Sequence, residues 1–369
     1  MSTRSGPVGV AVVGAGKISE QYLANLTQYP DAQVLYVADL LPDRAGQAAA
    51  AFDVDEYGTL DQALQHDDVE LIVNLTIPAA HADVASAALL AGKHVWNEKP
   101  LTMDRQSGIA LVEQAENAGL LLGCAPDTFL SPGFQAVRRM VDRGDIGRPV
   151  TASVVFQSPG PHTWHPSPDF LFQAGGGPLL DMGPYYLTVL SQVFGSITSV
   201  AARATSVGPT RTIATGPRAG ETFDVTVPTY VTAIYDFDTG AIAAGTFSFD
   251  SPLLREGVVE IAGTEATLAA PNPNQFGGDI RLMTLGDDTW RTVSVGGVEG
   301  GRGIGVVDMA RALRGGGPHR ATGRLGLHVL DAMLATAESI EQRVFVPVSS
   351  RLDDIPALPE GWDPTERTL

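Results

Sequence analysis

The fold of this 369-residue chain is decided near its start, by the stretch Val8-Gly9-Val10-Ala11-Val12-Val13-Gly14-Ala15-Gly16-Lys17-Ile18-Ser19. Its first six residues form an apolar run that is typical of a buried strand, and apolar residues recur at helical spacing from Ile18 onward. Gly14 permits a tight turn between the two, and Gly16 lets a phosphate approach the backbone. A helix N-terminus attracts phosphate through its free N–H groups and its dipole. The stretch therefore predicts a dinucleotide-binding turn.

The alternation of strands and helices continues through the first third of the chain. A second apolar run ends at Asp39, and Pro42 suits the first turn of the helix that follows. The expected strands span residues 8–13, 34–38, 71–75, 94–97 and 120–124, and the expected helices span residues 18–27, 42–52, 81–90 and 105–117. Strands that alternate with helices predict βαβ units. We therefore expect an α/β Rossmann domain with a parallel sheet over residues 1–126.

The residue pattern changes after Pro126. Stretches rich in Val, Thr and Phe become frequent, and they are typical of an antiparallel sheet. The expected strands span residues 150–157, 197–205, 230–237, 241–249, 258–262 and 345–348, and the expected helices span residues 132–143 and 325–341. Residues 207–227 hold many Gly, Pro and Thr, which indicates a surface excursion or lid. The pattern predicts an α+β domain over residues 127–369, with a large, open, mostly antiparallel sheet.

The composition narrows the partners of the protein. A net charge of -18 repels phosphate backbones and anionic lipids, so nucleic acid and membrane surfaces are excluded as partners. Cys124 is the single cysteine, so no disulfide can form within the chain. The residues before Val8 contain no apolar run that would direct secretion, and no run reaches membrane-spanning length. We expect a cytoplasmic protein that acts on a small molecule.

Asp39 is the residue that bears on the choice of cofactor. It ends the second strand, 25 residues after Gly14, where an acidic side chain accepts hydrogen bonds from the adenosine ribose. A carboxylate repels the 2′-phosphate of NADP, so NAD is favoured and NADP is the less favoured alternative. Arg44 lies close enough to weaken this argument. Asp39 can also be read as an ordinary turn residue.

Lys99 lies in the run Asn97-Glu98-Lys99-Pro100, directly after the strand of residues 94–97. Open α/β sheets bind ligands at the carboxyl ends of their strands, so this lysine is expected to face the cofactor. Pro100 can follow a cis peptide, which would aim the ammonium group into a crevice. Without this context, a solvated surface lysine is the simpler interpretation.

Five segments in this order resemble the Gfo/Idh/MocA family of oxidoreductases. They are the glycine turn, Asp39, Thr76-Ile77-Pro78 with His81, the run from His94 to Pro100, and Gly175-Gly176-Gly177-Pro178-Leu179-Leu180-Asp181-Met182-Gly183-Pro184-Tyr185. The resemblance covers nearly the whole chain. It implies a cofactor site made by Gly14, Gly16, Lys17, Ile18, Asp39, Thr76, Pro78, His81, Glu98 and Lys99.

The resemblance also implies the catalytic residues. It places Lys99 beside the nicotinamide, bound to the hydroxyl that is oxidised, and it places Asp181 and Tyr185 on one helical face toward the substrate. Many members have histidine where this chain has Tyr185; the glucose-fructose oxidoreductase and dihydrodiol dehydrogenase branches have tyrosine. A phenol, with a pKa of about 10, needs a cation within about 4–6 Å to act as a base near neutral pH. Lys99 is the expected cation.

The expected mechanism follows from these roles. Tyr185 takes the hydroxyl proton while Lys99 orients the oxygen, and hydride passes to the nicotinamide. Asp181 binds a neighbouring hydroxyl or holds the lysine. The alternative for Tyr185 is a core aromatic, a role that the adjacent Tyr186 also suits.

The expected substrate contacts lie in two further places. Trp164 in the segment from Pro161 to Pro166 is suited to stacking on a sugar face, and His165 is an alternative acid or base. His162 and His165 lack a carboxylate or cysteine at ligand spacing, so no metal site is expected. Asp127 lies at the interdomain crossing, where relatives often have an asparagine–arginine pair. Without that arginine, a neutral polyol or glycoside is favoured over an anion.

These observations predict an NAD-dependent oxidoreductase for a secondary alcohol or hemiacetal of a sugar, inositol or glycoside. Two alternatives stay open: a redox-neutral glycosidase or lyase that keeps its NAD bound, and a non-catalytic dinucleotide sensor. By resemblance, the second face of the C-terminal sheet is expected to form a homodimer or homotetramer.

Overall fold

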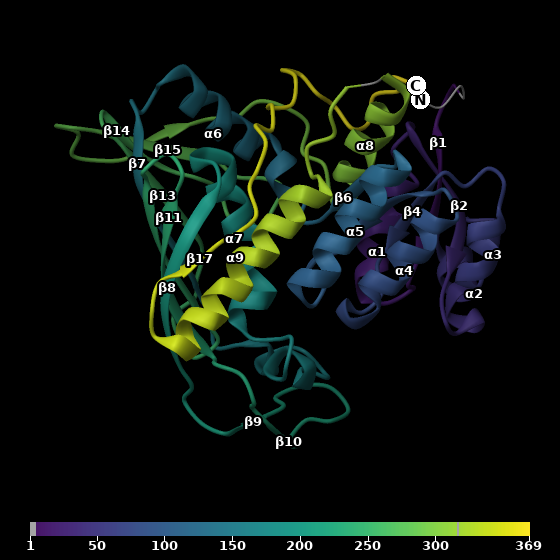
Figure 1. The fold of residues 1–369 in the computed structure, drawn as a ribbon, viewed down its shortest axis with the longest axis horizontal. Coiled ribbons are helices and arrows are strands. Elements are labelled where there is room, and N and C mark those ends of the chain that lie inside the picture. The colour runs from purple at the N-terminus through teal and green to yellow at the C-terminus, as the bar shows by residue number, and fades with distance from the viewer. Residues whose placement is uncertain (1–4, 316) are drawn as a thin grey trace. The chain divides into compact units, whose positions relative to one another are not determined.

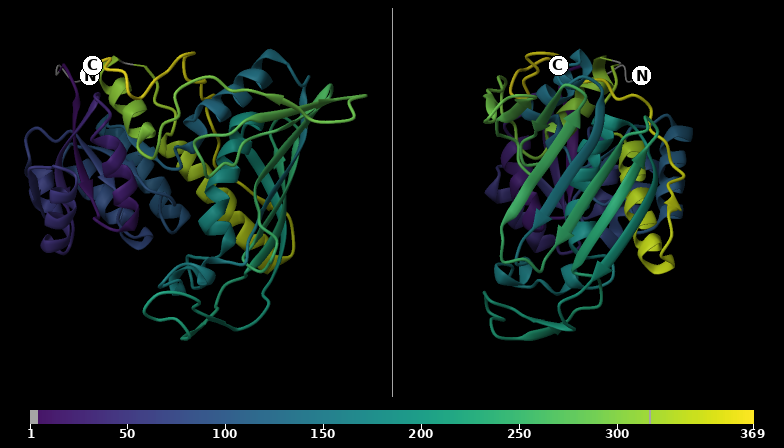
Figure 2. Two further views of the ribbon diagram at one scale, coloured as in Figure 1. Left: turned by 180° about the vertical axis from the view of Figure 1, so that it is seen from behind. Right: turned by 90° about the vertical axis from the view of Figure 1, so that its left-hand side faces the viewer.

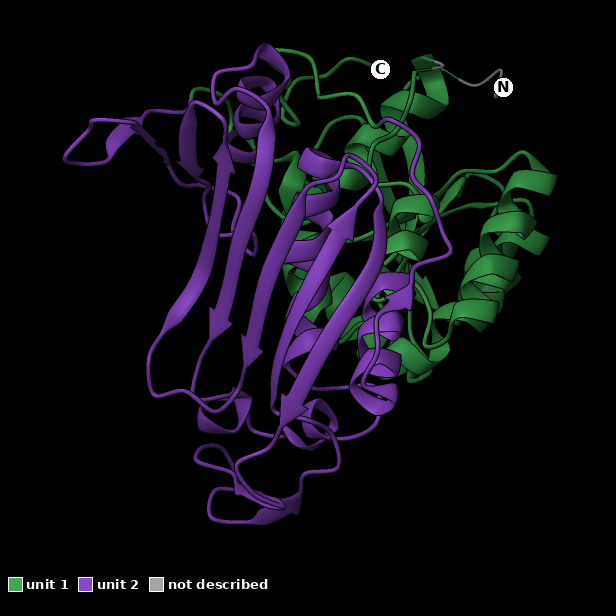
Figure 3. Ribbon diagram, turned by 60° about the vertical axis from the view of Figure 1, so that its left-hand side comes forward, with its two compact units in different colours: residues 1–132, 296–330, 355–369 green, residues 133–295, 331–354 purple. Residues whose placement is uncertain are grey.

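The structure is a computed structural model that describes residues 5–315 and 317–369 (Figure 1). It divides into two compact units (Figure 3). The first unit comprises residues 1–132, 296–330 and 355–369, and the second comprises residues 133–295 and 331–354. Among the described residues, no helix combines the length and apolar character that a membrane span requires.

The first unit is built on a six-stranded sheet with the order β3-β2-β1-β4-β5-β6, in which all neighbouring strands are parallel. Its strands are β1 (Val8–Val13), β2 (Ala32–Ala38), β3 (Glu56–Gly58), β4 (Leu71–Asn74), β5 (His94–Asn97) and β6 (Leu122–Cys124). β1, β4 and β6 are buried at every residue, as strands covered on both faces must be. The predicted parallel sheet is confirmed. The short edge strand β3 was not predicted.

Local signals in the sequence set the ends of the helices in this unit. The helices are α1 (Lys17–Leu26), α2 (Pro42–Ala51), α3 (Leu60–Gln65), α4 (His81–Leu90) and α5 (Arg105–Ala118). Thr59 and Gln62 form a capping box at the start of α3. The Asp104 side chain accepts the Ser107 N–H at the start of α5, and Gly119 ends that helix in the left-handed conformation with φ 66°.

The first unit also contains late segments of the chain, which differs from the expected division into residues 1–126 and 127–369. Helix α8 (Ile304–Gly315) belongs to it, as does the start of α9 (Gly323–Gln342). Arg314 pairs with Glu70 at 2.5 Å, and Arg311 pairs with the fully buried Asp31 at 2.7 Å. These long-range ion pairs join the late segments to the parallel sheet, so the compact units do not coincide with the two expected domains.

The second unit is built on a nine-stranded sheet with the order β16-β15-β14-β13-β7-β12-β11-β8-β17. Its strands are β7 (Pro149–Gln157), β8 (Ile197–Thr205), β11 (Tyr230–Phe237), β12 (Ile242–Ser248), β13 (Arg255–Gly263), β14 (Ala266–Ala269), β15 (Ile280–Thr284), β16 (Arg291–Val293) and β17 (Val346–Pro347). Only β12 and β7 pair in parallel; the other neighbours are antiparallel. The prediction of a large, mostly antiparallel sheet is confirmed.

Helices of the second unit cover one face of this sheet. They are α6 (Pro132–Arg143), α7 (Pro178–Phe194) and the later part of α9, and α7 packs on β7, β11 and β12. Tyr186 of α7 contacts Phe156 and Phe247 of the sheet edge-to-face, with ring centroids 6.4 and 5.6 Å away. The right-hand view of Figure 2 faces the other side of the strands, where the described residues place no helix. Ile234 and Ile242 are 45% and 47% exposed on this open face.

Candidate active site

The glycine turn between β1 and α1 has the geometry that a dinucleotide requires. Gly14 has φ +100°, and a Cβ there would lie 2.7 Å from the Leu75 carbonyl oxygen, so only glycine fits. A Cβ on Gly16 would meet nothing within 4 Å, so open space lies before the N-terminus of α1. Ser19, which stands in place of a third glycine, is buried and donates to the Gly16 carbonyl at 2.7 Å. The turn thus fits a pyrophosphate despite the substitution.

The Asp39 side chain holds the glycine turn by hydrogen bonds. Its Oδ2 accepts the Ala15 N–H at 2.8 Å, and its Oδ1 accepts the Leu41 N–H at 2.9 Å. The carboxylate is therefore fixed at the carboxyl end of β2, beside the space before α1. The Lys17 side chain is 86% exposed and pairs with Glu20 at 2.6 Å, so Lys17 is placed to contribute to a cofactor site through its backbone.

The Lys99 loop follows β5 and is held by buried amide groups. The Asn74 side chain donates to the Asn97 side chain at 2.6 Å, and Asn97 donates to the Leu101 carbonyl at 2.8 Å. Both asparagines are fully buried. The Lys99–Pro100 peptide is cis, in agreement with the possibility that the sequence raised. Lys99 is thereby carried on a fixed loop at the same sheet edge as the glycine turn.

His81 is buried beside the Lys99 loop. It is 1% exposed, and its Nδ1 and Nε2 lie 2.6 Å from the Pro100 carbonyl and 3.1 Å from the Thr76 carbonyl. Burial lowers the pKa of the imidazole. The neutral ring has one N–H and donates it to one of these two carbonyls, and His81 lies between the Lys99 loop and the half-exposed segment of Thr76 and Pro78. Its expected contact with the cofactor stays a prediction, and the hydrogen bonds support the position of the Lys99 loop.

Glu98 also faces the interior of the first unit. It is 8% exposed, its Oε1 accepts the Tyr22 hydroxyl at 2.8 Å, and its Oε2 accepts the Lys99 N–H at 2.9 Å. Glu98 thus supports the backbone of the neighbouring lysine, and its expected cofactor contact stays a prediction. Sequence reasoning missed Tyr22, because an aromatic residue on the apolar face of α1 reads as part of the core.

Asp127, which is among the expected substrate contacts, is fully buried, and its substrate contact stays a prediction. Its Oδ2 accepts the N–H groups of Gly303 and Gly305, at 2.8 and 3.2 Å, where α8 begins. Burial raises the pKa of Asp127 to about 6, and Arg302 and the two N–H groups oppose that rise. Asp127 stabilises the start of α8.

Asp181 and Tyr185 lie one turn apart on α7 in the second unit. Gly177 precedes the helix with φ 91° and donates its N–H to the Leu171 carbonyl at 2.7 Å, so the glycine-rich run turns the chain sharply into α7. Asp181 is half-buried and Tyr185 is 4% exposed. Tyr186 is fully buried and its hydroxyl accepts the Gly257 N–H at 2.8 Å, which makes it the core tyrosine of the pair.

An exposed group of aromatic rings precedes α7. Trp164 is 66% exposed and Phe170 is 55% exposed. The His165 ring contacts both, with centroid distances of 5.5 Å to Trp164 and 5.7 Å to Phe170. The His165 Nδ1 accepts the Ser167 N–H at 3.0 Å, so its Nε2 is left as the group that can exchange a proton. Such rings offer a stacking surface for a sugar.

The segment of residues 207–227 forms a hairpin of β9 (Thr210–Thr212) and β10 (Thr222–Asp224). Arg218 donates to both carboxylate oxygens of Asp169 at 2.8 and 3.0 Å, and Arg211 pairs with the buried Asp250. The hairpin is thus joined to the substrate segment, here defined as residues 161–177, by the Arg218–Asp169 ion pair and by backbone hydrogen bonds from Ala214 to His162 and from Thr226 to Phe172. The Arg211–Asp250 ion pair joins it to the residues that follow β12.

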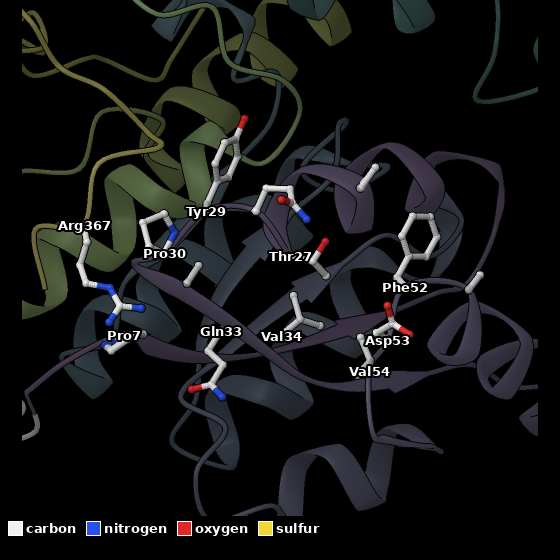
Figure 4. Close-up of a pocket in the computed structure, with 14 residues that line it drawn as sticks. Pro7, Thr27, Tyr29, Pro30, Gln33, Val34, Phe52, Asp53, Val54 and Arg367 are labelled. Carbon is white, nitrogen blue, oxygen red and sulfur yellow. The ribbon is translucent and has the colours of Figure 1, made fainter.

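A groove of about 780 Å³ lies away from these residues (Figure 4). Pro7, Gln33 and Val34 line it, so it lies where β1 and β2 begin, at the sheet edge opposite to Gly14. Ligands of open α/β sheets bind at the carboxyl ends, so this groove is not the dinucleotide site. Among the described residues, no group of three or more His, Cys, Asp or Glu side chains is placed to hold a metal.

Two models of one protein family match most of the chain. The model of an oxidoreductase family with an NAD-binding Rossmann fold matches residues 8–125. The model of the GFO/IDH/MocA C-terminal domain matches residues 134–269.

Three proteins with a matching sequence or fold are named as dehydrogenases. The chain is 25% identical to scyllo-inositol 2-dehydrogenase (NAD(+)) of Bacillus subtilis over 264 residues, which cover 71% of this chain and 73% of that protein. It is 29% identical to trans-1,2-dihydrobenzene-1,2-diol dehydrogenase of Bos taurus over 265 residues, with the same coverage of 71% and 73%. The structure of levoglucosan dehydrogenase in complex with NADH and L-sorbose matches with a TM-score of 0.81 at 20% identity, over 94% of this chain and 100% of that chain. At that identity the likeness shows a shared fold.

Proposed function

Because the chain belongs to the GFO/IDH/MocA family and is an NAD(P)-dependent dehydrogenase, we propose that it transfers hydride between NAD and a CH–OH carbon of a neutral sugar, inositol or glycoside. One observation carries the proposal. The loop of Lys99 is fixed by buried hydrogen bonds at the sheet edge that also presents the glycine turn. A cation held there is suited to bind the oxygen of an alcohol whose carbon exchanges hydride with the cofactor.

The residues of the first unit fit the dinucleotide in two places. Gly14, Gly16 and the N-terminus of α1 would hold the pyrophosphate, since Gly16 borders open space. Asp39 would accept the ribose hydroxyls, and its charge supports NAD over NADP. When bound, the cofactor supplies the hydride-exchanging carbon of the nicotinamide.

The chain's own residues supply binding, orientation and proton transfer. Lys99 binds the hydroxyl oxygen, and Tyr185 takes the hydroxyl proton in oxidation and returns it in reduction. Asp181, on the same face of α7 as Tyr185, binds a neighbouring hydroxyl. Trp164 and Phe170 stack on a sugar face, which their exposure supports. The approach of Tyr185 to Lys99 is part of this proposal.

The first experiment compares the wild type with Lys99→Ala. Each is mixed with NAD or NADP and a panel of aldoses, inositols and glycosides, and the near-ultraviolet absorbance of reduced nicotinamide is followed. We expect NAD reduction with one class of polyol, and a loss of at least about a hundredfold in Lys99→Ala with little change in the dissociation constant for NADH. Equal rates in the two proteins would contradict the role of Lys99.

The same panel separates the alternatives. Sugar release without accumulation of NADH would replace the proposal by a redox-neutral glycosidase or lyase. Cofactor binding with no reaction of any sugar would replace it by a dinucleotide sensor.

We further propose that two copies associate through the open face of the nine-stranded sheet. Ile234 and Ile242 expose nearly half of their surface there, and burial of such side chains favours association. Light scattering after gel filtration should give a dimer or tetramer for the wild type and a smaller mass for the double variant Ile234→Lys, Ile242→Lys. A wild-type monomer would contradict this proposal.

A further inference from the structure

Three buried side chains link helix α1 to the Lys99 loop within the first unit. The Trp96 indole N–H donates to the Tyr22 hydroxyl oxygen at 3.2 Å, and the Tyr22 hydroxyl donates to Glu98 Oε1 at 2.8 Å. Glu98 Oε2 then accepts the Lys99 N–H at 2.9 Å. Trp96 and Tyr22 are fully buried and Glu98 is 8% exposed, so water does not compete for these bonds.

The direction of each hydrogen bond in this chain is determined. An indole N–H can only donate, and an ionised carboxylate can only accept. The Tyr22 oxygen must therefore accept from Trp96 and turn its own proton to Glu98. Burial and the charge of Glu98 raise the pKa of Tyr22 well above its usual value, so the hydroxyl keeps its proton.

The Trp96 end of the chain is fixed by packing. A Cβ added to Gly305, at the start of α8, would overlap the outer edge of the indole. A Cβ added to Gly123 of β6 would lie 2.7 Å from the ring on its Cε3 side. Because backbone touches Trp96 from two elements, the indole cannot shift, and the bond to Tyr22 starts from a fixed point.

We propose that Tyr22 is a positioning residue for Lys99. It lies on α1, five residues after the start of the helix at Lys17, and it holds the Glu98 carboxylate that in turn holds the Lys99 backbone. The helix that receives the dinucleotide and the loop that carries the lysine are therefore joined by one buried hydrogen bond. This inference rests on the proposed role of Lys99 and adds the residue that sets its place.

The composition of the chain gives a readout that needs no activity. Only three lysines occur among the 369 residues, Lys17, Lys93 and Lys99. Reductive methylation with isotope-labelled formaldehyde keeps the charge of the lysines and gives each one a methyl signal in the NMR spectrum. The signal that is absent from Lys99→Arg is assigned to Lys99. The Lys93 amino group donates to the His66 and Val69 carbonyls, and Lys17 pairs with Glu20 on the surface. Both serve as internal references.

In Tyr22→Phe we expect the Lys99 methyl signal to move or broaden while the Lys17 and Lys93 signals stay in place. We expect kcat to fall about tenfold, with the dissociation constant for NAD within about twofold of wild type, because one buried hydrogen bond that aligns the lysine is lost. An unchanged Lys99 signal together with an unchanged kcat would overturn the proposal and leave Tyr22 as a core residue.

Two further variants make the test specific. Tyr36→Phe removes another buried tyrosine hydroxyl of the same unit, one that bonds Gln62 at 3.3 Å, and should leave the Lys99 signal unchanged. In a Glu98→Gln background, Tyr22→Phe should add little further loss, because Tyr22 acts through Glu98. If the losses in kcat from Tyr22→Phe and Glu98→Gln are fully additive, Tyr22 does not act through Glu98. If the wild type turns over no substrate, the proposed function fails while the methyl signals still decide the role of Tyr22.

Discussion

The Lys99 loop of the first unit and the substrate segment of the second are held in place by different interactions. The loop is fixed by the buried side chains of Asn74, Asn97 and His81, which bond one another or the carbonyls of the loop. The substrate segment is joined to the 207–227 hairpin by the Arg218–Asp169 ion pair and by two backbone hydrogen bonds, and its Trp164 and Phe170 rings are exposed. The loop proposed to face the cofactor is fixed by buried side chains, whereas the segment proposed to bind the sugar presents exposed rings at the surface, where side chains can be exchanged without disturbing a sheet.

The strengths of the two kinds of attachment are also expected to differ. A half-exposed ion pair such as Arg218–Asp169 is screened by water and contributes little to stability. Removing one partner of a buried ion pair such as Arg211–Asp250 is costly, because the charge that remains has neither a partner nor water to solvate it. The hairpin should therefore depend on one of its two ion pairs far more than on the other.

The largest effect is expected at the two adjacent tyrosines of α7. Tyr185→Phe removes the proposed proton acceptor and should lower kcat/KM about a thousandfold with almost no change in melting temperature. Tyr186→Phe leaves the Gly257 N–H without its acceptor and should lower the free energy of unfolding by about 1 kcal/mol while kcat/KM stays within about threefold. Steady-state kinetics and urea titrations measure both. The reverse pattern would show that Tyr186, and not Tyr185, is the proton acceptor.

The next effect is expected in the hairpin. Arg211→Met leaves the Asp250 carboxylate buried with Thr229 as a remaining donor at 2.6 Å, and should lower the free energy of unfolding by about 3–4 kcal/mol. Arg218→Met, as the matched control, should cost far less, because water screens its ion pair with Asp169. Adding Asp250→Asn to Arg211→Met should restore part of the loss, since no charge is then stranded. Equal costs for the two arginines, measured by urea unfolding, would contradict the contrast between them.

The bounds of strands and helices are predicted best from the sequence, because local residue patterns determine them. The strand of residues 94–97 and the helix of residues 81–90 were predicted with the bounds that the structure has, because apolar runs and glycine ends are local signals. The place of α8 was not predicted, because the pairing of Arg314 with Glu70 joins residues 244 positions apart and leaves no trace in a local pattern.

The same distinction holds for the candidate site. Gly14, Asp39 and Lys99 lie at strand ends, where the strand pattern itself gives their position. Whether a side chain at such a place faces a ligand or the interior is a tertiary property, so His81, Glu98 and Asp127 were predicted as ligand contacts and lie buried. Trp96 and Tyr22 were passed over because their hydrogen-bonding groups are hidden in apolar stretches.

The third effect is a dependence of stability on pH at Asp127. Burial raises the pKa of this carboxyl to about 6 in the folded state, against about 3.9 in an unfolded chain. The folded state thus binds the proton more tightly, so this stabilisation is complete below about pH 4 and is lost as the pH rises through about 6. The loss amounts to about 3 kcal/mol.

Asp127→Asn removes this titration. Relative to wild type, the free energy of unfolding of the variant should improve by about 3 kcal/mol between about pH 4 and pH 7. Asp104→Asn is a control of opposite sign, because hydrogen bonds from Ser107 lower the pKa of Asp104, whose contribution is lost as the pH falls. Parallel pH profiles for wild type and Asp127→Asn in urea titrations would show that Asp127 does not titrate in this range.

The smallest effect, and the one that most sharpens the picture of the cofactor edge, is expected from Asp39→Asn. The amide can still accept one of the two N–H groups, from Ala15 or Leu41, so the turn should persist. What is lost is the negative charge, so the ratio of NAD to NADP affinity should fall about tenfold, and Arg44→Ala in that background should remove any gain for NADP. Titration of the fluorescence of NADH and NADPH measures each affinity. If the ratio stays as in wild type, Asp39 serves to close the glycine turn, and discrimination between the cofactors is made by other residues of the first unit.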